Sequence, residues 1–221
     1  MGLFPVFLKL SERPCLVVGA GNIAQSKIES LLTAGAKVTV VSPEALPEVA
    51  AHAGAGRIVW HRRDYVFGDL AGVFLVVAAT DEAAVNQAVY RDAVERGVLC
   101  NAVDDPPHCD FYFPSIVSRG DLQIAISTAG ESPAFAQQLR REIDAQLPAD
   151  LGPWLEQLGG LRREVLAAHP AGEERKQLLH TLAQRQLCEA EECPTRKLAR
   201  QAPELQKSGL QKPGLQKEVH A

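Results

Sequence analysis

The chain has 221 residues, 46% hydrophobic and 23% charged, a balance typical of a soluble globular protein with one sizeable core and a smaller appendage. Its formal net charge of −4 argues against nucleic acid as the main partner, because neutralising phosphates needs a basic face. No apolar stretch approaches the ~18 residues of a membrane span, and the apolar start lacks a basic region. We therefore expect no membrane partner, no secretory signal and a cytoplasmic location.

The first half of the chain alternates between apolar runs and helical patterns. A strand predicted over 15–19 ends in a glycine turn, a helix follows over 22–34, and a second strand covers 37–41. Further along come two strands, an amphipathic helix and a last strand, over 57–60, 73–78, 82–96 and 98–103. Such alternation predicts a doubly wound parallel sheet of the Rossmann type, an α/β fold that we place at residues 1–113.

The pattern changes after residue 113. Arg119-Gly120-Asp121 separates two apolar runs within 115–127, which predicts a hairpin. Ser132-Pro133 then opens a helix that ends near Leu147, with serine as the N-cap and proline in the first turn. We assign 114–147 to a small α+β region for dimerisation, 148–202 to a helical region, and 203–221, where a Leu-Gln-Lys unit repeats, to a disordered tail.

The cysteines are odd in number and widely scattered, which favours reduced thiols over a disulfide framework. Cys188 and Cys193 lie close together in an acidic stretch. Without a second pair or a nearby histidine, they do not form a zinc motif. The sequence therefore predicts no metal site.

The first glycine turn carries a dinucleotide-binding fingerprint, Gly19-x-Gly21-x-x-Ala24, between a predicted strand and a predicted helix. The first glycine permits a tight turn, the second lets the backbone approach a pyrophosphate, and the alanine lets the helix pack on the sheet. Free N–H groups and the helix dipole favour phosphate at that helix start. We therefore expect a nicotinamide cofactor to bind at Gly19, Gly21, Asn22, Ile23 and Ala24.

Two further strand ends complete the predicted cofactor site. At the end of the second strand Ser42 can donate to a ribose hydroxyl or to a 2′-phosphate, and Glu44 is the nearest acid. The lack of an arginine there favours NAD over NADP, although the sequence does not settle the choice. Thr80, at the end of the fourth strand, is placed to hydrogen-bond the nicotinamide ribose. In the alternative, which carries equal weight, Asp81 or Thr80 caps the helix that follows, and both roles can hold together.

Five motifs, in this order, resemble the siroheme synthase N-terminal family over about residues 4–147. They are Gly19-Ala-Gly-Asn-Ile-Ala24 with Lys27, Ala78-Ala-Thr-Asp81 with Val85-Asn86, Cys100-Asn-Ala-Val-Asp104 with Pro106, Phe113-Pro-Ser115, and Ser127-Thr-Ala-Gly-Glu-Ser-Pro133. Members of this family are precorrin-2 dehydrogenases, and some also act as sirohydrochlorin ferrochelatases. The resemblance implies NAD-dependent oxidation of precorrin-2 to sirohydrochlorin on a homodimer built by the hairpin and its helix. It leaves the ferrochelatase activity open, and the repeat tail matches nothing in the family.

The resemblance makes Asp104 the essential acid. A carboxylate at a strand end beside the nicotinamide can take the proton that must leave when a hydride leaves. Asn101 and Val103 match family positions near the nicotinamide. The alternative for Asp104 is a residue that starts a turn at Asp105-Pro106.

Several side chains are candidates for contact with a carboxylate-rich tetrapyrrole. His108 and Cys109 follow Asp104 and are otherwise ordinary loop residues. Ser127 and Thr128 begin a loop whose N–H groups can bind carboxylates, and some relatives have a serine linked to regulation in place of Thr128. The local positive charge that such a substrate needs comes from Arg119, Arg140 and Arg141, for which exposed surface charge is the alternative.

Three other functions compete with the bifunctional enzyme. The first is a dehydrogenase without chelatase activity, and the second is an NAD-sensing regulatory module without chemistry. Such a module needs the glycine turn but has no use for Asn101-Ala-Val-Asp104. The third, a dehydrogenase for an unrelated small substrate, is disfavoured because no histidine or lysine base accompanies the fold.

Overall fold

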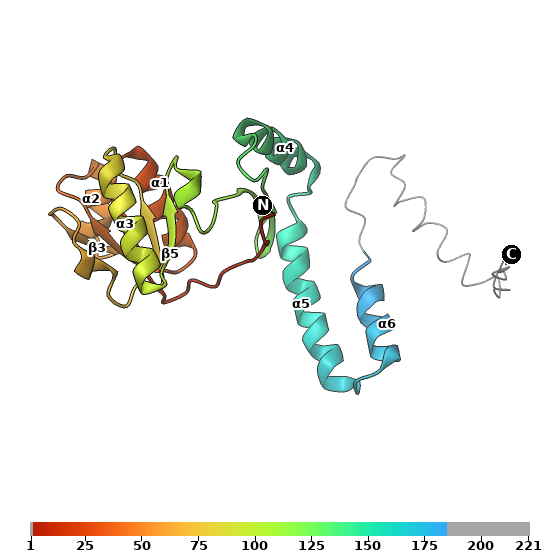
Figure 1. Ribbon diagram of the computed structural model, residues 1–221. Coiled ribbons are helices and arrows are strands. Elements are labelled where there is room, and N and C mark those ends of the chain that lie inside the picture. The colour runs from red at the N-terminus through yellow and green to blue at the C-terminus, as the bar shows by residue number, and fades with distance from the viewer. Residues whose placement is uncertain (1, 185–221) are drawn as a thin grey trace, which may run out of the picture. The chain divides into compact units, whose positions relative to one another are not determined.

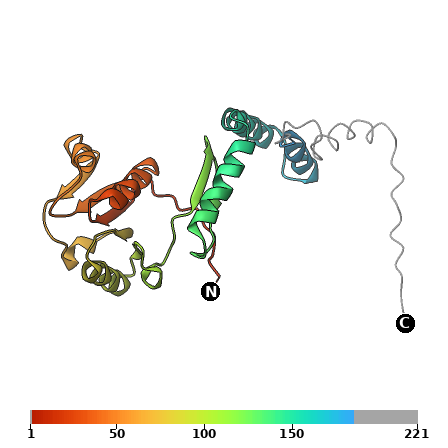
Figure 2. The ribbon, with the colours of Figure 1, turned by 90° about the horizontal axis from the view of Figure 1, so that it is seen from above.

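The computed structural model describes residues 2–184, which form two compact units (Figures 1 and 2). Unit 1 contains the chain up to Phe113 together with Ala129–Glu131, and unit 2 contains Pro114–Thr128 and the chain from Ser132 onward. Beyond the described residues lie the end of the predicted helical region, the Cys188 and Cys193 pair, and the repeat tail predicted at 203–221.

Unit 1 is built on a five-stranded sheet in the order β3-β2-β1-β4-β5. All neighbouring strands are parallel, so the predicted doubly wound sheet is confirmed. The register pairs Val18 at the end of β1 with Val41 of β2 and Ala78 of β4, which brings these carboxyl ends to one edge. The strands are β1 (Pro14–Val18), β2 (Lys37–Val41), β3 (Ile58–His61), β4 (Leu75–Ala78) and β5 (Leu99–Ala102).

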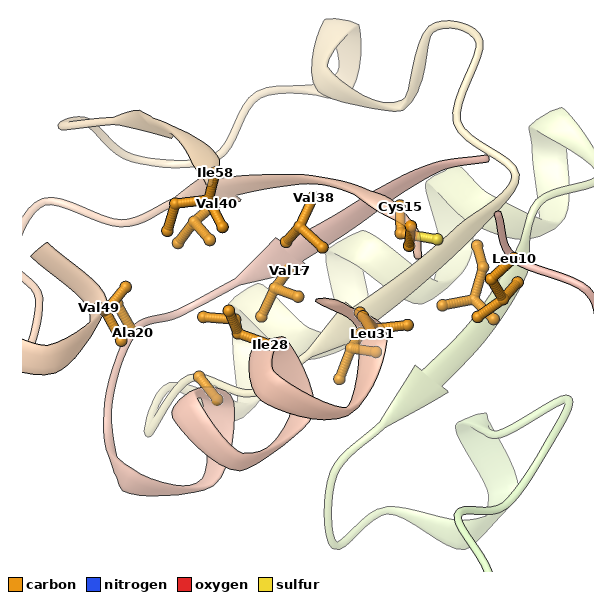
Figure 3. Close-up of a cluster of buried hydrophobic side chains, with 14 residues drawn as sticks. Leu10, Cys15, Val17, Ala20, Ile28, Leu31, Val38, Val40, Val49 and Ile58 are labelled. Atoms are coloured by element: carbon orange, nitrogen blue, oxygen red, sulfur yellow. The ribbon is translucent and has the colours of Figure 1, made fainter. Parts of the chain in front are cut away.

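Helices cover both faces of this sheet because successive strand residues point to opposite sides. On one face, β1 and β2 side chains pack with α1 (Asn22–Thr33) and α2 (Pro47–Gly54), as the cluster around Val17, Ile28 and Val49 shows (Figure 3). On the other face the alternate strand residues pack with Val89 and Ala93 of α3 (Ala83–Arg96). Two short 3₁₀ turns, η1 (Phe67–Leu70) and η2 (Pro106–His108), complete unit 1.

Helix α2 is the element of unit 1 that the sequence analysis did not predict. It is short, it begins at Pro47, and Val49 is its single buried residue. One buried position in an alanine-rich segment gives no helical periodicity to detect. The turn that leads into α2 contributes to the site described below.

Unit 2 begins with the predicted hairpin, β6 (Ser115–Arg119) and β7 (Leu122–Ile126), which pair antiparallel. Helix α4 (Pro133–Gln146) packs on the hairpin, and α5 (Leu151–Ala168) lies beside α6 (Glu173–Leu182) (Figure 1). The predicted cap of α4 is confirmed, because Ser132 Oγ accepts a hydrogen bond from Phe135 N at 3.2 Å. None of the helices in residues 2–184 combines the length and apolar character that a membrane crossing requires.

Candidate active site

A cleft of about 900 Å³ opens at the carboxyl edge of the sheet in unit 1. Parallel sheets bind ligands at this edge. The glycine turn after β1, the segment from Val41 to Leu46, residues 64 and 65, the turn after β4 and the first turns of α3 form its walls. Four of the predicted cofactor residues line the cleft: Gly19, Gly21, Ser42 and Thr80.

The glycine turn fits a pyrophosphate. Gly19 has a φ of +103°, and a Cβ there would overlap the carbonyl oxygen of Ala79, so only glycine can make this turn. A Cβ on Gly21 would meet nothing within 4 Å. Gly21 is the N-cap of α1, which has neither a side-chain cap nor an acid in its first turn. The helix N-terminus is therefore open to an anion. Asn22 and Ile23 are exposed in that first turn, whereas Ala24 is fully buried against the sheet.

The wall after β2 is acidic. Ser42 Oγ donates to the carbonyl oxygen of Glu44 at 2.7 Å, and Ser42 O accepts a hydrogen bond from Trp60 Nε1 at 3.0 Å. Glu44 lines the cleft together with Asp64, Asp81 and Glu82, and the described lining contains no lysine, arginine or histidine. The sequence analysis missed Asp64 and the neighbouring Tyr65, because only the fold brings the segment after β3 to this wall.

The turn after β4 is held by a buried asparagine. Thr80 Oγ1 donates to Asn86 Oδ1 at 2.8 Å and accepts from Glu82 N at 3.2 Å, while Asn86 Nδ2 donates to Thr80 O at 2.9 Å. Thr80 thus lines the cleft, and its hydroxyl bonds the backbone just before α3, whose N-cap residue is Glu82 and which has no side-chain cap. A contact of Thr80 with the nicotinamide ribose stays a prediction. Asn86 is 7% exposed, and its spacing of three and seven residues from the buried Val89 and Ala93 was the available signal for such a clamp.

Asp104 lies in a tight turn at the end of β5, the fifth strand and an edge of the sheet. Val103 N donates to Ala78 O at 2.9 Å, and Asp105 N donates back to Ala102 O at 3.2 Å. Asp104 is exposed and has a φ of +59°, a left-handed conformation that is uncommon outside glycine. Asp104, Asn101 and Val103 are not among the residues that line the cleft. The strand that precedes Asp104, β5, pairs with β4, and the turn after β4 lines the cleft.

The loop after Asp104 is fastened to β5. Asn101 is 7% exposed and its Nδ2 donates to Phe111 O at 2.7 Å, so its amide holds the loop. Asp110 Oδ2 accepts from Cys100 N at 2.9 Å, and Cys109 Sγ donates to Ala102 O at 3.0 Å.

His108 is also engaged within this loop. Its Nδ1 lies 2.6 Å from Asp105 Oδ2, and its ring meets Tyr90 edge to face with centroids 4.7 Å apart. Together with the bonds to β5, this pair fixes the backbone on which Asp104 sits.

Lys27 on α1 is a polar neighbour of Asp104 that the sequence analysis did not assign to the site. Its Nζ lies 4.0 Å from the centroid of the Phe113 ring, and its side chain is half-buried. Burial lowers the pKa of Lys27, and the negative charge of Asp104 opposes that shift. The fold therefore brings a cation and an acid from distant parts of the sequence to one place.

The polar candidates of unit 2 are engaged in internal contacts. Arg119 Nη1 lies 2.7 Å from Asp144 Oδ1, and its Nη2 donates to the carbonyl oxygens of Asp144 and Leu147 at 2.8 and 3.2 Å. Arg119 thus ties the hairpin to the last carbonyls of α4. Arg140 Nη1 lies 3.8 Å from Asp144 Oδ2, and Arg141 Nη2 donates to Gln138 Oε1 at 2.7 Å. Thr128 Oγ1 accepts a hydrogen bond from Ser132 N at 3.2 Å. Ser127 is exposed.

The cysteines of the described chain are free thiols. Cys15 and Cys100 are buried, and Cys109 is half-buried. Within residues 2–184, no three histidine, cysteine, aspartate or glutamate side chains gather in a cluster that could hold a metal ion.

Two family models match the chain. One, described as putative NAD(P)-binding, covers residues 6–115, and the other, described as sirohaem biosynthesis protein central, covers residues 119–146. The matches follow the two units, since the first ends close to Phe113. Unit 1 is thereby an NAD(P)-binding domain.

Curated relatives extend this likeness. A siroheme synthase 1 of Aeromonas salmonicida is 43% identical over 182 residues, which is 82% of this chain and 39% of that protein. A siroheme synthase 1 of Cronobacter sakazakii is 46% identical over 162 residues, 73% of this chain and 34% of the relative. The chain therefore spans less than half the length of these relatives.

A solved structure resembles nearly the whole chain. It is described as SirC, precorrin-2 dehydrogenase, and it superposes with a TM-score of 0.71 at 26% sequence identity. The likeness covers 93% of this chain and 98% of that one. Unlike the longer siroheme synthases, this relative is therefore matched over almost its full length.

Proposed function

The chain belongs to the siroheme synthase N-terminal family, and from this premise we propose that it oxidises precorrin-2 to sirohydrochlorin with NAD as the electron acceptor. The observation that carries the proposal is the placement of Asp104 at the strand end beside the dinucleotide cleft, on a loop fastened to β5. An NAD-sensing module needs the cleft, but it has no need for an exposed carboxylate in a left-handed turn.

The reaction removes two electrons and two protons from the tetrapyrrole. A nicotinamide held in the cleft would supply the acceptor for one hydrogen, which leaves with both electrons as a hydride. The second hydrogen leaves as a proton, and a carboxylate oxygen of Asp104 accepts it and passes it to water. The N-terminus of α1 and the turn at Gly19 and Gly21 bind the pyrophosphate, while Ala24 sets α1 against the sheet. Thr80 and Ser42 line the same cleft, and each offers a hydroxyl group to a ribose.

The acidic wall supports NAD as the dinucleotide. A 2′-phosphate carries negative charge and is usually met by an arginine, whereas a free ribose hydroxyl is met by a carboxylate. The described lining offers Glu44 and Asp64 and no basic side chain. Like charges at this wall would repel NADP.

We also infer that unit 2 forms a homodimer. Its hairpin and α4 leave Ile116 and Phe135 exposed, at 46% and 58%, whereas few of its residues are buried. Exposed apolar side chains on neighbouring elements are typical of a surface that another protein covers. A second copy of this chain carries the same patch and can cover it symmetrically.

The substitution Asp104→Asn tests the catalytic assignment. Asparagine keeps the shape and tolerates a left-handed backbone, but it cannot accept the proton. We expect kcat/KM for precorrin-2 oxidation to fall by about 100-fold or more, with NAD affinity unchanged. NADH formation from enzymatically prepared precorrin-2 is the measurement. Asp121→Asn, at the hairpin tip, removes the same charge from an exposed turn and serves as the control.

Two results would contradict the proposal: unchanged turnover of the Asp104→Asn variant, or NAD binding by the unaltered chain without any oxidation of precorrin-2. The same assay with NADP tests the choice of dinucleotide. A further sample supplied with sirohydrochlorin and ferrous iron tests the second family activity. A rate above the metal-only control would add ferrochelation to the function.

A further inference from the structure

The ammonium of Lys27 in unit 1 has no role in the proposed reaction as described so far. It rests on the Phe113 ring, 4.0 Å from the centroid, and it senses the charge of Asp104 without forming an ion pair with it. In the described chain it has no hydrogen-bond acceptor, although the side chain is half-buried. Two other cations of unit 1 have acidic partners, since Lys37 pairs with Glu12 at 2.7 Å and Arg63 pairs with Asp69.

A half-buried ammonium without an acceptor favours an anionic ligand. Burial removes part of its hydration, and this lowers the pKa of Lys27. An incoming carboxylate restores the lost interactions through charge-assisted hydrogen bonds. Phe113 orients the lysine, because its ring face attracts the ammonium and holds the flexible side chain in one place.

The position of Lys27 relates this anion site to the reacting groups. Lys27 lies six residues after Gly21 on α1, or about 9 Å along the helix axis from the pyrophosphate end. Its charge also interacts with that of Asp104, although the two side chains form no ion pair in the described chain. A molecule with acid arms around a planar ring can place one arm on Lys27 while the ring meets Asp104.

We propose that Lys27 binds a side-chain carboxylate of the tetrapyrrole and so positions the reacting ring against Asp104. The inference rests on the proposed function for the identity of the substrate. It assigns the substrate-binding cation to α1 of unit 1. This differs from the sequence-based expectation of Arg119, whose guanidinium ties the hairpin to α4.

Binding of a stable tetrapyrrole tests this assignment without turnover. Uroporphyrin I carries acetate and propionate arms and is fluorescent, so its affinity for the full chain is measured by quenching. We expect Lys27→Met to weaken uroporphyrin binding about tenfold and to reduce its salt dependence, while NAD affinity, measured by calorimetry, stays unchanged. Lys27→Arg should restore part of the affinity. In the oxidation assay, Lys27→Met should raise KM for precorrin-2 more than it lowers kcat.

Lys37→Met is the matched control. It removes the same charge from unit 1 at the amino end of β2, where the lysine is 67% exposed, and it should leave uroporphyrin affinity unchanged. Lys27→Gln, which keeps polarity, replaces the methionine variant if that variant does not fold, as judged by NAD binding. Uroporphyrin binding by both Lys27 variants at the affinity of the unaltered chain would overturn the proposal.

The two proposals fail in different ways. If the unaltered chain binds uroporphyrin in a Lys27-dependent manner but does not oxidise precorrin-2, the proposed reaction is wrong and the tetrapyrrole site stands. If it oxidises precorrin-2 and Lys27→Met alters neither KM nor uroporphyrin affinity, the reaction stands and the role of Lys27 is wrong.

Discussion

Units 1 and 2 stabilise their folds differently. In unit 1, valines and leucines of β1, β2 and β4 are almost completely buried between helices on both faces of the sheet. In the described part of unit 2, the residues with a buried side chain are Val117, Ile126, Ala136 and Leu151, while Phe135 and Ile116 are exposed. Unit 1 therefore contains its own core. Unit 2 exposes apolar side chains that a second molecule can bury. The difference matches the proposed roles, with cofactor binding in unit 1 and dimer formation in unit 2.

The largest expected effect breaks unit 1 at its glycine turn. In Gly19→Ala, the new Cβ overlaps the carbonyl oxygen of Ala79 and a φ of +103° becomes strained. We expect the free energy of unfolding to fall by more than about 3 kcal/mol, with loss of NAD binding. Urea denaturation and calorimetry are the measurements.

Gly21→Ala is the matched control, because its Cβ meets only open space. It should keep the stability of the unaltered chain and lose NAD affinity, since the methyl group stands where the pyrophosphate lies. Normal NAD binding by Gly21→Ala would argue against this placement of the cofactor.

A second change tests the exposed surface of unit 2. In Phe135→Glu, a charge replaces a side chain that is 58% exposed on α4, and it would be desolvated in a dimer. We expect the dimer dissociation constant to rise by about 30-fold or more, with NAD affinity unchanged. Sedimentation velocity measures the change. Gln137→Glu adds a charge to an exposed site on the same helix and should leave the dimer intact. A monomeric unaltered chain would contradict the proposed homodimer.

The smallest effect is a pH dependence confined to unit 1. Burial raises the pKa of Cys15 from its ordinary value of 9.0 to about 11. The folded chain thus keeps the thiol proton that the unfolded chain releases, so this stabilisation is complete below pH 9 and is lost as the pH rises through 11. Between pH 9 and pH 11, the free energy of unfolding of the Cys15→Ala variant should fall by about 2 kcal/mol less than that of the unaltered chain. Equal pH slopes in urea denaturation would contradict the assignment.

The sequence predicted the structural features that depend on residues close together in the chain. The strands follow valine-rich runs, and Ser132-Pro133 caps α4 through contacts within one turn. The fingerprint located Gly19 and Gly21 because a glycine turn between strand and helix is a local feature. Helix α2 was not predicted because Val49 is its single buried residue and gives no helical periodicity.

The sequence could not show which partner each polar side chain would take. Asn101 donates to Phe111 O, and Arg119 binds the end of α4, because folding brings these acceptors within reach. Lys27 and Asp104 lie far apart in the chain, and only the fold brings their charges within range of each other. Such pairs depend on tertiary distances, about which residue spacing carries no information.

The end of β4 has a consequence for redesign of the protein. The backbone of Ala79 lies against Gly19, and Ala78 O accepts the hydrogen bond from Val103 N, directly before Asp104. The glycine turn at Gly19 and the turn that carries Asp104 thus contact two consecutive alanines, Ala79 and Ala78. A substitution that moves the backbone at Ala78 or Ala79 is therefore expected to displace both turns, so the two cannot be re-engineered independently.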